Sequence, residues 1–77
     1  MRTGLADITL HIDETLDQQA LLGLEDKMRH LGGVKNIHVE TARPHLMVVG
    51  YDPEGLNSHD ILGYVQHQGL HAELIGL

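Results

Sequence analysis

The 77-residue sequence has no cysteine, tryptophan or phenylalanine, and these absences narrow the classes of protein to which it can belong. Without cysteine the chain can form no disulfide bond, no redox-active thiol pair and no nucleophilic thiol. Aromatic residues, two tyrosines, make up only 3% of the chain, which leaves little surface for stacking on bases or sugar rings. The core is therefore expected to consist of leucine, isoleucine and valine, with Met28 and Met47 filling gaps.

Positive charge is also scarce. Only five residues are lysine or arginine, and the formal net charge is −6 with histidine neutral. Nucleic acids and anionic membrane surfaces are recognised through clustered cations, so neither is expected as a partner. No apolar run approaches the roughly 20 residues of a membrane span, and residues 1–7 lack the apolar stretch of a secretion signal. These features predict a cytoplasmic protein with no nucleic-acid or membrane partner.

Histidine, in contrast, is abundant, with seven residues in the chain. Protonation of all seven would raise the formal charge by seven, from −6 to +1. Because histidine titrates near pH 6.5, mild acid is expected to change how the protein associates.

Hydrophobic periodicity predicts six elements in a single domain that covers residues 1–77. Ile8, Leu10 and Ile12 alternate with polar residues, as in a half-buried strand, whereas apolar residues between positions 16 and 31 recur every three or four residues, as on one face of a helix. The predicted order is a strand at 7–12, a helix at 16–31, strands at 34–40 and 45–51, a helix from 57 to 69, and a strand at 70–75. This order indicates an α+β fold with two helices over one face of an antiparallel four-stranded sheet.

Local signals predict the ends of these elements. Thr15 with Gln18 three residues later is typical of a capping box, and Gly32 with Gly33 is typical of a helix end. Asn57 with Asp60 predicts the start of the second helix. Turns are expected at residues 41–44 and 52–55.

Several short segments recur in a familiar order: Gly33-Val34 with alternating Ile37 and Val39, then Val-Gly-Tyr-Asp-Pro-Glu at 49–54, and finally the apolar pattern of residues 56–72. Together they resemble the heavy-metal-associated (HMA) domain family of copper-chaperone-like proteins, over nearly the whole chain. The resemblance implies a ferredoxin-like βαββαβ sandwich.

That family holds copper(I) or another soft ion in a Met-x-Cys-x-x-Cys loop between the first strand and the first helix, and passes it to a matching partner domain. Counting back from Gly33, the methionine position falls on Thr15 and the two cysteine positions fall on Asp17 and Ala20. Alanine offers no ligand atom, and a carboxylate is a hard donor that suits copper(I) poorly. The thiolate chemistry that the resemblance implies is therefore not expected here.

Histidine and carboxylate side chains could form a different site. His11, His38 and His71 are expected on the sheet face that the helices leave open. In the family's strand order (fourth, first, third, second), His11 and His71 lie on neighbouring strands, and Glu40 and Glu73 share their face. His11, His71 and Glu73 would suit zinc, nickel or copper(II). Alternatively, exposed strand histidines are compatible with water and need no ligand role, and no HxH or HxxxH spacing links these three histidines to one another.

The remaining polar groups near this region have structural explanations. If His45 points inward, a hydrogen-bonded core histidine is expected rather than a ligand. Asp13, Glu14 and Asp17 border the start of the first helix, where carboxylates complement the helix dipole. His30 and His67, in the last turns of their helices, do the same at the opposite end.

The open sheet face is predicted to be a contact surface. Leu46, Val48 and Ile75 are expected on it, with His38 beside them, and an uncovered apolar patch is typical of an interface. Scattered exposed aliphatic residues, however, are normal on any protein surface. We expect self-association of two sheets face to face, weakened in mild acid.

These features predict a non-enzymatic binding or adaptor protein that contacts another copy of itself or another protein. No catalytic residues are identified, because Ser58 is the only serine and a small aliphatic core leaves little room for a cleft. The alternative is a carrier or sensor of a divalent ion with His and carboxylate ligands; otherwise no cofactor is expected. A small-ligand sensor is a third hypothesis, which rests on fold analogy alone.

Overall fold

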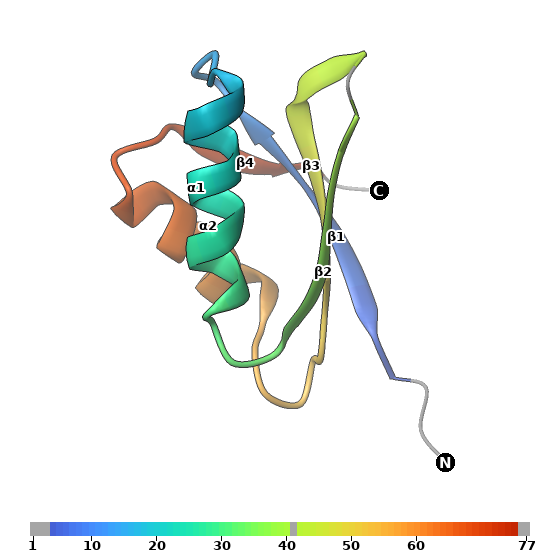
Figure 1. Cartoon of the computed structure of the whole chain (residues 1–77). Helices are drawn as coiled ribbons and strands as arrows, with labels where there is room; N and C mark the ends of the chain where they lie inside the picture. Colours follow the sequence, from blue (N-terminus) through green and yellow to red (C-terminus); the bar gives the residue numbers. More distant parts are fainter. Residues whose placement is uncertain (1–3, 41, 76–77) are drawn as a thin grey trace.

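The computed structural model describes residues 4–40 and 42–75, which form six elements in the order β1-α1-β2-β3-α2-β4 (Figure 1). The elements are β1 (Ala6–Ile12), α1 (Gln18–Arg29), β2 (Val34–Glu40), β3 (Arg43–Tyr51), α2 (Ser58–His67) and β4 (Ala72–Ile75). The predicted order and type of all six elements are confirmed.

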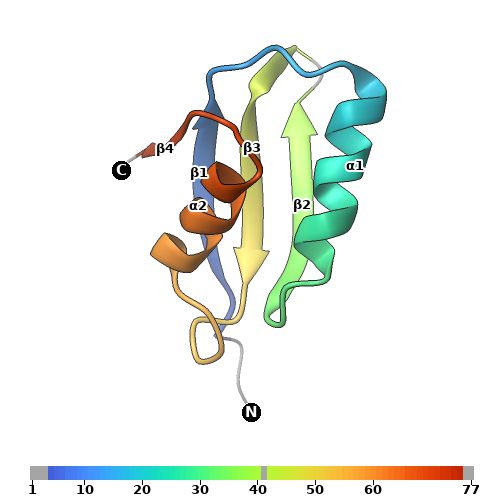
Figure 2. The same ribbon diagram turned by 90° about the vertical axis from the view of Figure 1, so that its left-hand side faces the viewer.

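The four strands form one antiparallel sheet in the order β2-β3-β1-β4, the strand order that the family resemblance implied. Both helices lie against the same face of the sheet, toward the viewer in Figure 2. The opposite face is covered by no helix or strand that the structure describes (Figure 1). The fold is therefore the predicted ferredoxin-like α+β sandwich with one open sheet face.

The core lies between the sheet and the helices, and it is aliphatic as predicted. Side chains that alternate along β1 and β3 point into it, and each helix contributes two buried residues. Both Met28 and Met47 are buried, with 0% and 1% exposure. The buried set is Leu10, Ile12, Leu24, Met28, Met47, Val49, Tyr51, Ile61 and Val65.

The start of α1 differs from the prediction. The helix begins at Gln18, and Asp17 is its N-cap, with a carboxylate oxygen that accepts a hydrogen bond from the Ala20 backbone N–H at 2.7 Å. The predicted capping box of Thr15 and Gln18 is wrong, because the charged side chain two residues later satisfies the free N–H at the positive end of the helix. The prediction for α2 is correct: Asn57 and Asp60 form a reciprocal capping box.

α2 ends at His67, with Gln68 as its C-cap and the left-handed Gly69 directly after it, as predicted. α1 ends at Arg29, two residues earlier than predicted, with His30 as its C-cap, and the left-handed Gly33 lies in the following turn. Gly33 has a φ of 105° and Gly69 a φ of 90°, values that other residues rarely adopt.

Within the described ranges, no helix combines the length and the apolar character needed to cross a membrane.

Three strand boundaries also differ, the first by one residue, because β1 begins at Ala6. β3 begins at Arg43 rather than at 45, so the turn between β2 and β3 is shorter than predicted; its residue Thr41 lies outside the described residues. Pro44 fits in β3 because the pairing with β1 ends at Leu46, which leaves the missing N–H of proline without consequence for that ladder. β4 begins at Ala72 rather than at 70, so Leu70 and His71 precede the strand.

Candidate functional site

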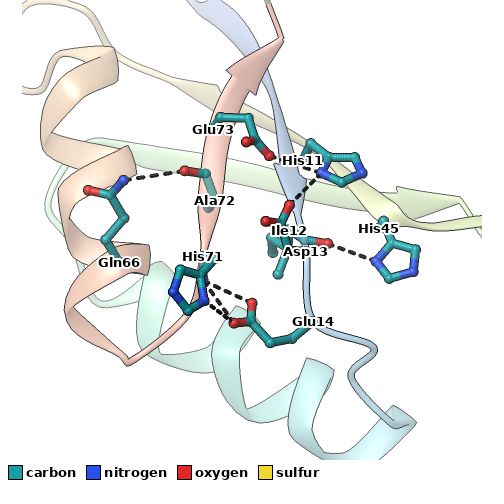
Figure 3. A network of polar contacts seen from close by, with 9 residues as sticks. All are labelled: His11, Ile12, Asp13, Glu14, His45, Gln66, His71, Ala72 and Glu73. Carbon is teal, nitrogen blue, oxygen red and sulfur yellow. Dashed lines mark hydrogen bonds and ion pairs between the residues drawn. The ribbon is translucent and has the colours of Figure 1, made fainter.

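Polar side chains converge where β1, the loop after it and β4 meet at one end of the sheet (Figure 3). His11 Nδ1 lies 3.1 Å from Asp13 Oδ1 and 3.1 Å from Glu73 Oε1. One ligand atom from each of the three residues lies within 4.8 Å of those of the other two. We call these three residues the His11 cluster.

The sheet register explains this convergence. His11 pairs directly with Glu73 across β1 and β4, so their side chains share one face. Their chain neighbours Ile12 and Ala72 turn the other way, toward the core. Asp13 follows one residue after β1, where its backbone N–H donates to the His71 carbonyl at 2.8 Å and continues the pairing beyond the last strand residue.

All three side chains of the His11 cluster reach solvent. The exposed fractions are 38% for His11, 54% for Asp13 and 59% for Glu73. An ion held by them would be reached from water and would keep water or another molecule in its remaining coordination positions.

One imidazole and two carboxylates form a donor set for zinc, nickel or copper(II) rather than for copper(I), because nitrogen and oxygen donors are harder than thiolate. Coordination through His11 Nδ1 requires that nitrogen to be free of its proton, so metal binding would compete with the hydrogen bonds to the two carboxylates.

The structure brings together two members of the predicted set. His11 and Glu73 meet, whereas His71 pairs elsewhere: its Nδ1 lies 2.6 Å from Glu14 Oε2, and its backbone N–H donates to the same carboxylate at 2.9 and 3.1 Å. His71 precedes β4 instead of lying within it, so its ring does not follow the strand alternation on which the prediction rested.

Asp13 takes the third place, and the sequence analysis missed it by assigning this carboxylate to the start of the helix. A signal for it was present. Asp13 is two residues beyond His11, so continued strand alternation would place both side chains on the same face.

The paired side chains of Glu14 and His71 form a clasp beside the His11 cluster. The hydrogen bond to Glu14 is the main cause that raises the pKa of His71 above its ordinary value. The same bond is the main cause that lowers the pKa of Glu14. Because Glu14 follows Asp13 and His71 lies two residues before Glu73, the clasp fixes the two chain segments that carry the carboxylates of the cluster.

His45 supports the other side of the cluster. Its ring stacks on that of His11, with centroids 5.7 Å apart and planes 20° apart. Its Nδ1 is 2.7 Å from the Ile12 carbonyl, to which it donates a hydrogen bond. His45 is half-buried and hydrogen-bonded, but it is not among the buried residues of the core, so of the predicted core histidine only the hydrogen bond agrees with the structure.

The positions of the family's cysteine motif have other tasks in this chain. Asp17 caps α1, and Ala20 supplies the backbone N–H that it caps. Thr15 is exposed in the preceding loop. No pair of soft donors exists at this turn, so the residues do not fit a copper(I) ion.

The residues predicted for a contact surface lie in register on the open face. One row across the sheet runs from His38 through Val48 and Thr9 to Ile75. Leu46 lies in the next row, directly opposite His11. Ile75 is 40% exposed, and Leu46 and Val48 are half-buried.

No family model and no curated protein matches the sequence, but solved structures match the fold, each with a TM-score of 0.80. A copper-binding domain of HMA7, a P-type ATPase, is 18% identical, over 91% of this chain and 93% of its own. Oxidised MerP from Ralstonia metallidurans CH34 is 12% identical, over 94% and 99%. A copper-ion-binding protein, assigned as such in Bacillus anthracis str. Ames, is 19% identical, over 94% and 100%. The chain therefore has the fold of heavy-metal-associated domains and contains none of the cysteines of their metal motif.

Proposed function

We propose that this protein is a non-enzymatic binding protein that holds a divalent metal ion with the His11 cluster. The observation that carries the proposal is the convergence of one imidazole and two carboxylates, all within 4.8 Å of one another. The protein-contact hypothesis favoured by the sequence becomes the second candidate, because the three-residue group is the more specific feature.

Electrostatics support an ion at this position. Asp13 and Glu73 bring two carboxylates to the same imidazole, so the site is net negative when His11 is neutral. In the described part of the chain, neither carboxylate forms an ion pair with a lysine or an arginine. A divalent cation would compensate this charge, and it would do so more completely than protonation of His11.

The exposure of the site favours a carrier or a sensor over a structural role. Structural zinc sites are closed by four protein ligands, whereas this cluster offers three and is open to solvent. An ion with free coordination positions can be taken up from one donor molecule and released to another. The solved structures of similar fold include copper-binding proteins, which supports metal binding as a use of this scaffold.

Calorimetric titration of the purified protein with zinc, nickel and copper(II) salts tests the proposal. We expect one ion per chain, bound with sub-micromolar affinity and lost in the double variant His11→Ala, Glu73→Gln. The matched control is His38→Ala, Glu40→Gln, because that pair is also exposed, with His38 Nε2 3.7 Å from Glu40 Oε2, and belongs to no described three-residue group. Absence of binding, or equal loss in both double variants, would overturn the proposal.

We also propose a second candidate function, the association of two copies through the open sheet face. Val48 and Ile75 lie there in one row, on either side of Thr9, and Leu46 lies in the next row. A domain of this size gains stability by covering such a surface. His11 and His38 lie directly opposite Leu46 and Val48 on this face, so protonation of the histidines would place like charges on the two facing sheets and weaken a face-to-face pair.

Sedimentation at pH 7.5 and 5.5 measures this association. We expect a concentration-dependent dimer at pH 7.5 that weakens at pH 5.5 and is lost in Ile75→Lys. Leu22→Lys is the control, because Leu22 is 54% exposed on α1, on the other side of the sheet. A monomer at both pH values would contradict this candidate function and leave the metal proposal standing.

A further inference from the structure

A groove of about 300 Å³ lies on the helix side of the molecule, between α1 and the segment after α2. Leucine side chains form its walls: Leu16 from the loop before α1, Leu24 from α1 and Leu70 from the segment before β4. Leu16 and Leu70 are only half-buried, so apolar surface remains in contact with water. The groove is on the opposite side of the sheet from the His11 cluster, and nothing in the proposed metal function uses it.

A glycine in the middle of α1 opens the groove. Gly23 lines it, and a Cβ atom built at this position would meet nothing within 4 Å. Glycine inside a helix lowers stability by about 1 kcal/mol relative to alanine. No packing contact requires a glycine at this position. The effect of its missing side chain is the open space above α1, which is part of the groove.

A cation lies at the end of the groove away from Leu16. Lys27, one helical turn beyond Gly23, contributes its side chain there. Among the described residues its polar partner is the neutral amide oxygen of Gln68, at 3.4 Å, and no carboxylate lies within ion-pair distance. A lysine without an acidic partner beside an apolar groove can pair with an anionic head group at short range, although the net charge of −6 opposes an anion at longer range.

We infer that this groove binds a small amphiphile with an apolar chain and a carboxylate head group, that is, a free medium-chain fatty acid. The chain would lie along Leu16, Leu24 and Leu70, and the head group would replace Gln68 as the partner of Lys27. The size of the groove, at the lower end of small-molecule sites, limits the ligand to a short or medium chain.

Titration of the metal-free protein with octanoate, followed by backbone amide chemical shifts, tests the inference. We expect saturable shifts at residues of the groove, and affinity for uncharged octan-1-ol at least tenfold weaker. Gly23→Leu should abolish binding by filling the groove while improving helix propensity. Lys27→Met keeps the apolar stem and removes the charge, so it should remove the preference for octanoate over octanol.

The control is Gly63→Leu, because Gly63 is the equivalent open glycine of α2 and does not line the groove. Circular dichroism verifies that each variant is folded. The inference is overturned if octanoate gives no saturable shifts, if shifts concentrate on the open sheet face, or if Gly63→Leu weakens binding as much as Gly23→Leu. It is equally overturned if the wild-type protein binds octanol as tightly as octanoate.

Discussion

Single side chains at the β1–α1 loop determine both where the first helix starts and what kind of chemistry the loop can support. The carboxylate of Asp17 accepts the Ala20 N–H at 2.7 Å, so it stabilises the exposed first turn of α1. In the resembling family the same position would carry a thiolate. Here the side chain is a helix cap, whereas the nearby Asp13 contacts His11 of β1 and Glu14 contacts His71, the residue before β4.

Replacement of Asp17 tests this role. Asp17→Ala should lower the free energy of unfolding by about 1 kcal/mol, because one N–H loses its acceptor and the helix dipole loses a complementary charge. Asp17→Asn should retain most of the stability. Thr15→Ala should change stability little, because the side chain of Thr15 does not cap the helix.

Urea denaturation of the three variants measures these differences. A larger loss in Thr15→Ala than in Asp17→Ala would show that the helix starts two residues earlier than the structure places it. The metal affinity of the His11 cluster should be unchanged in Asp17→Ala, which separates capping from metal binding.

At the scale of elements, β4 is the strand with the fewest pairing contacts. It has four residues and lies at the edge of the sheet, paired only with β1. The clasp between Glu14 and His71 adds a link from the β1–α1 loop to the residue just before this strand. The position of β4 therefore depends in part on groups that titrate.

The clasp predicts a pH dependence of stability for the metal-free protein. His71 has a pKa raised above 6.5, so its contribution is complete below pH 6.5 and is lost as the pH rises through the raised value. Glu14 has a pKa lowered below 4.5, so its contribution is present above pH 4.5 and is lost as the pH falls through the lowered value. Both contributions are therefore complete between about pH 4.5 and 6.5.

Chemical denaturation of the wild type and of Glu14→Gln across pH 4 to 9, with a chelator present, checks this dependence. The difference in unfolding free energy between the two proteins should be largest in that window and should shrink at pH 8 and above. A difference that does not vary with pH would mean that the clasp contributes only a neutral hydrogen bond.

The elements themselves could be predicted from the sequence, because alternation and helical periodicity report directly on burial. Strand alternation also placed His11 and Glu73 on one face, where they meet. The same rule failed for His71, because β4 begins at Ala72, two residues later than predicted. His71 therefore lies outside the strand, and its side chain pairs with Glu14. Asp13 was missed because a carboxylate near a helix start has a sufficient local explanation, although alternation continued by one residue beyond the strand places it beside His11.

At the scale of the whole molecule, nine buried side chains among residues 4–40 and 42–75 form the core, and the margin of stability is small for so short a chain. Truncation of a fully buried side chain should therefore remove much of the free energy of unfolding. Leu10→Ala, at a site with 0% exposure, should lower the unfolding free energy by about 2–5 kcal/mol. Leu22→Ala, at a site with 54% exposure, should change it by less than about 0.5 kcal/mol. Thermal denaturation followed by circular dichroism measures both, and similar losses in the two variants would contradict the assigned core.

The stability of such a small domain should respond strongly to a ligand that binds its folded form. The His11 cluster is a site of this kind, because it joins residues 62 positions apart that meet only when the chain is folded. An ion at a concentration of 100 times its Kd would stabilise the folded state by about 2.7 kcal/mol. For a domain of this length, each kcal/mol raises the Tm by about 4–8 °C. Zinc should therefore raise the Tm by about 10–20 °C, and a chelator should reverse the shift.

Any zinc bound by histidines of the unfolded chain, which has seven, would reduce the shift, and it would do so equally in two variants that each lack one histidine. The difference between variants is therefore the informative quantity. His38→Ala, Glu40→Gln should keep the full zinc-dependent shift, whereas His11→Ala, Glu73→Gln should lose it, although each variant removes one histidine and one glutamate. If zinc lowers the Tm, or raises it equally in both, the ion binds the histidines without regard to the fold, and the register that brings Glu73 to His11 has no part in holding it.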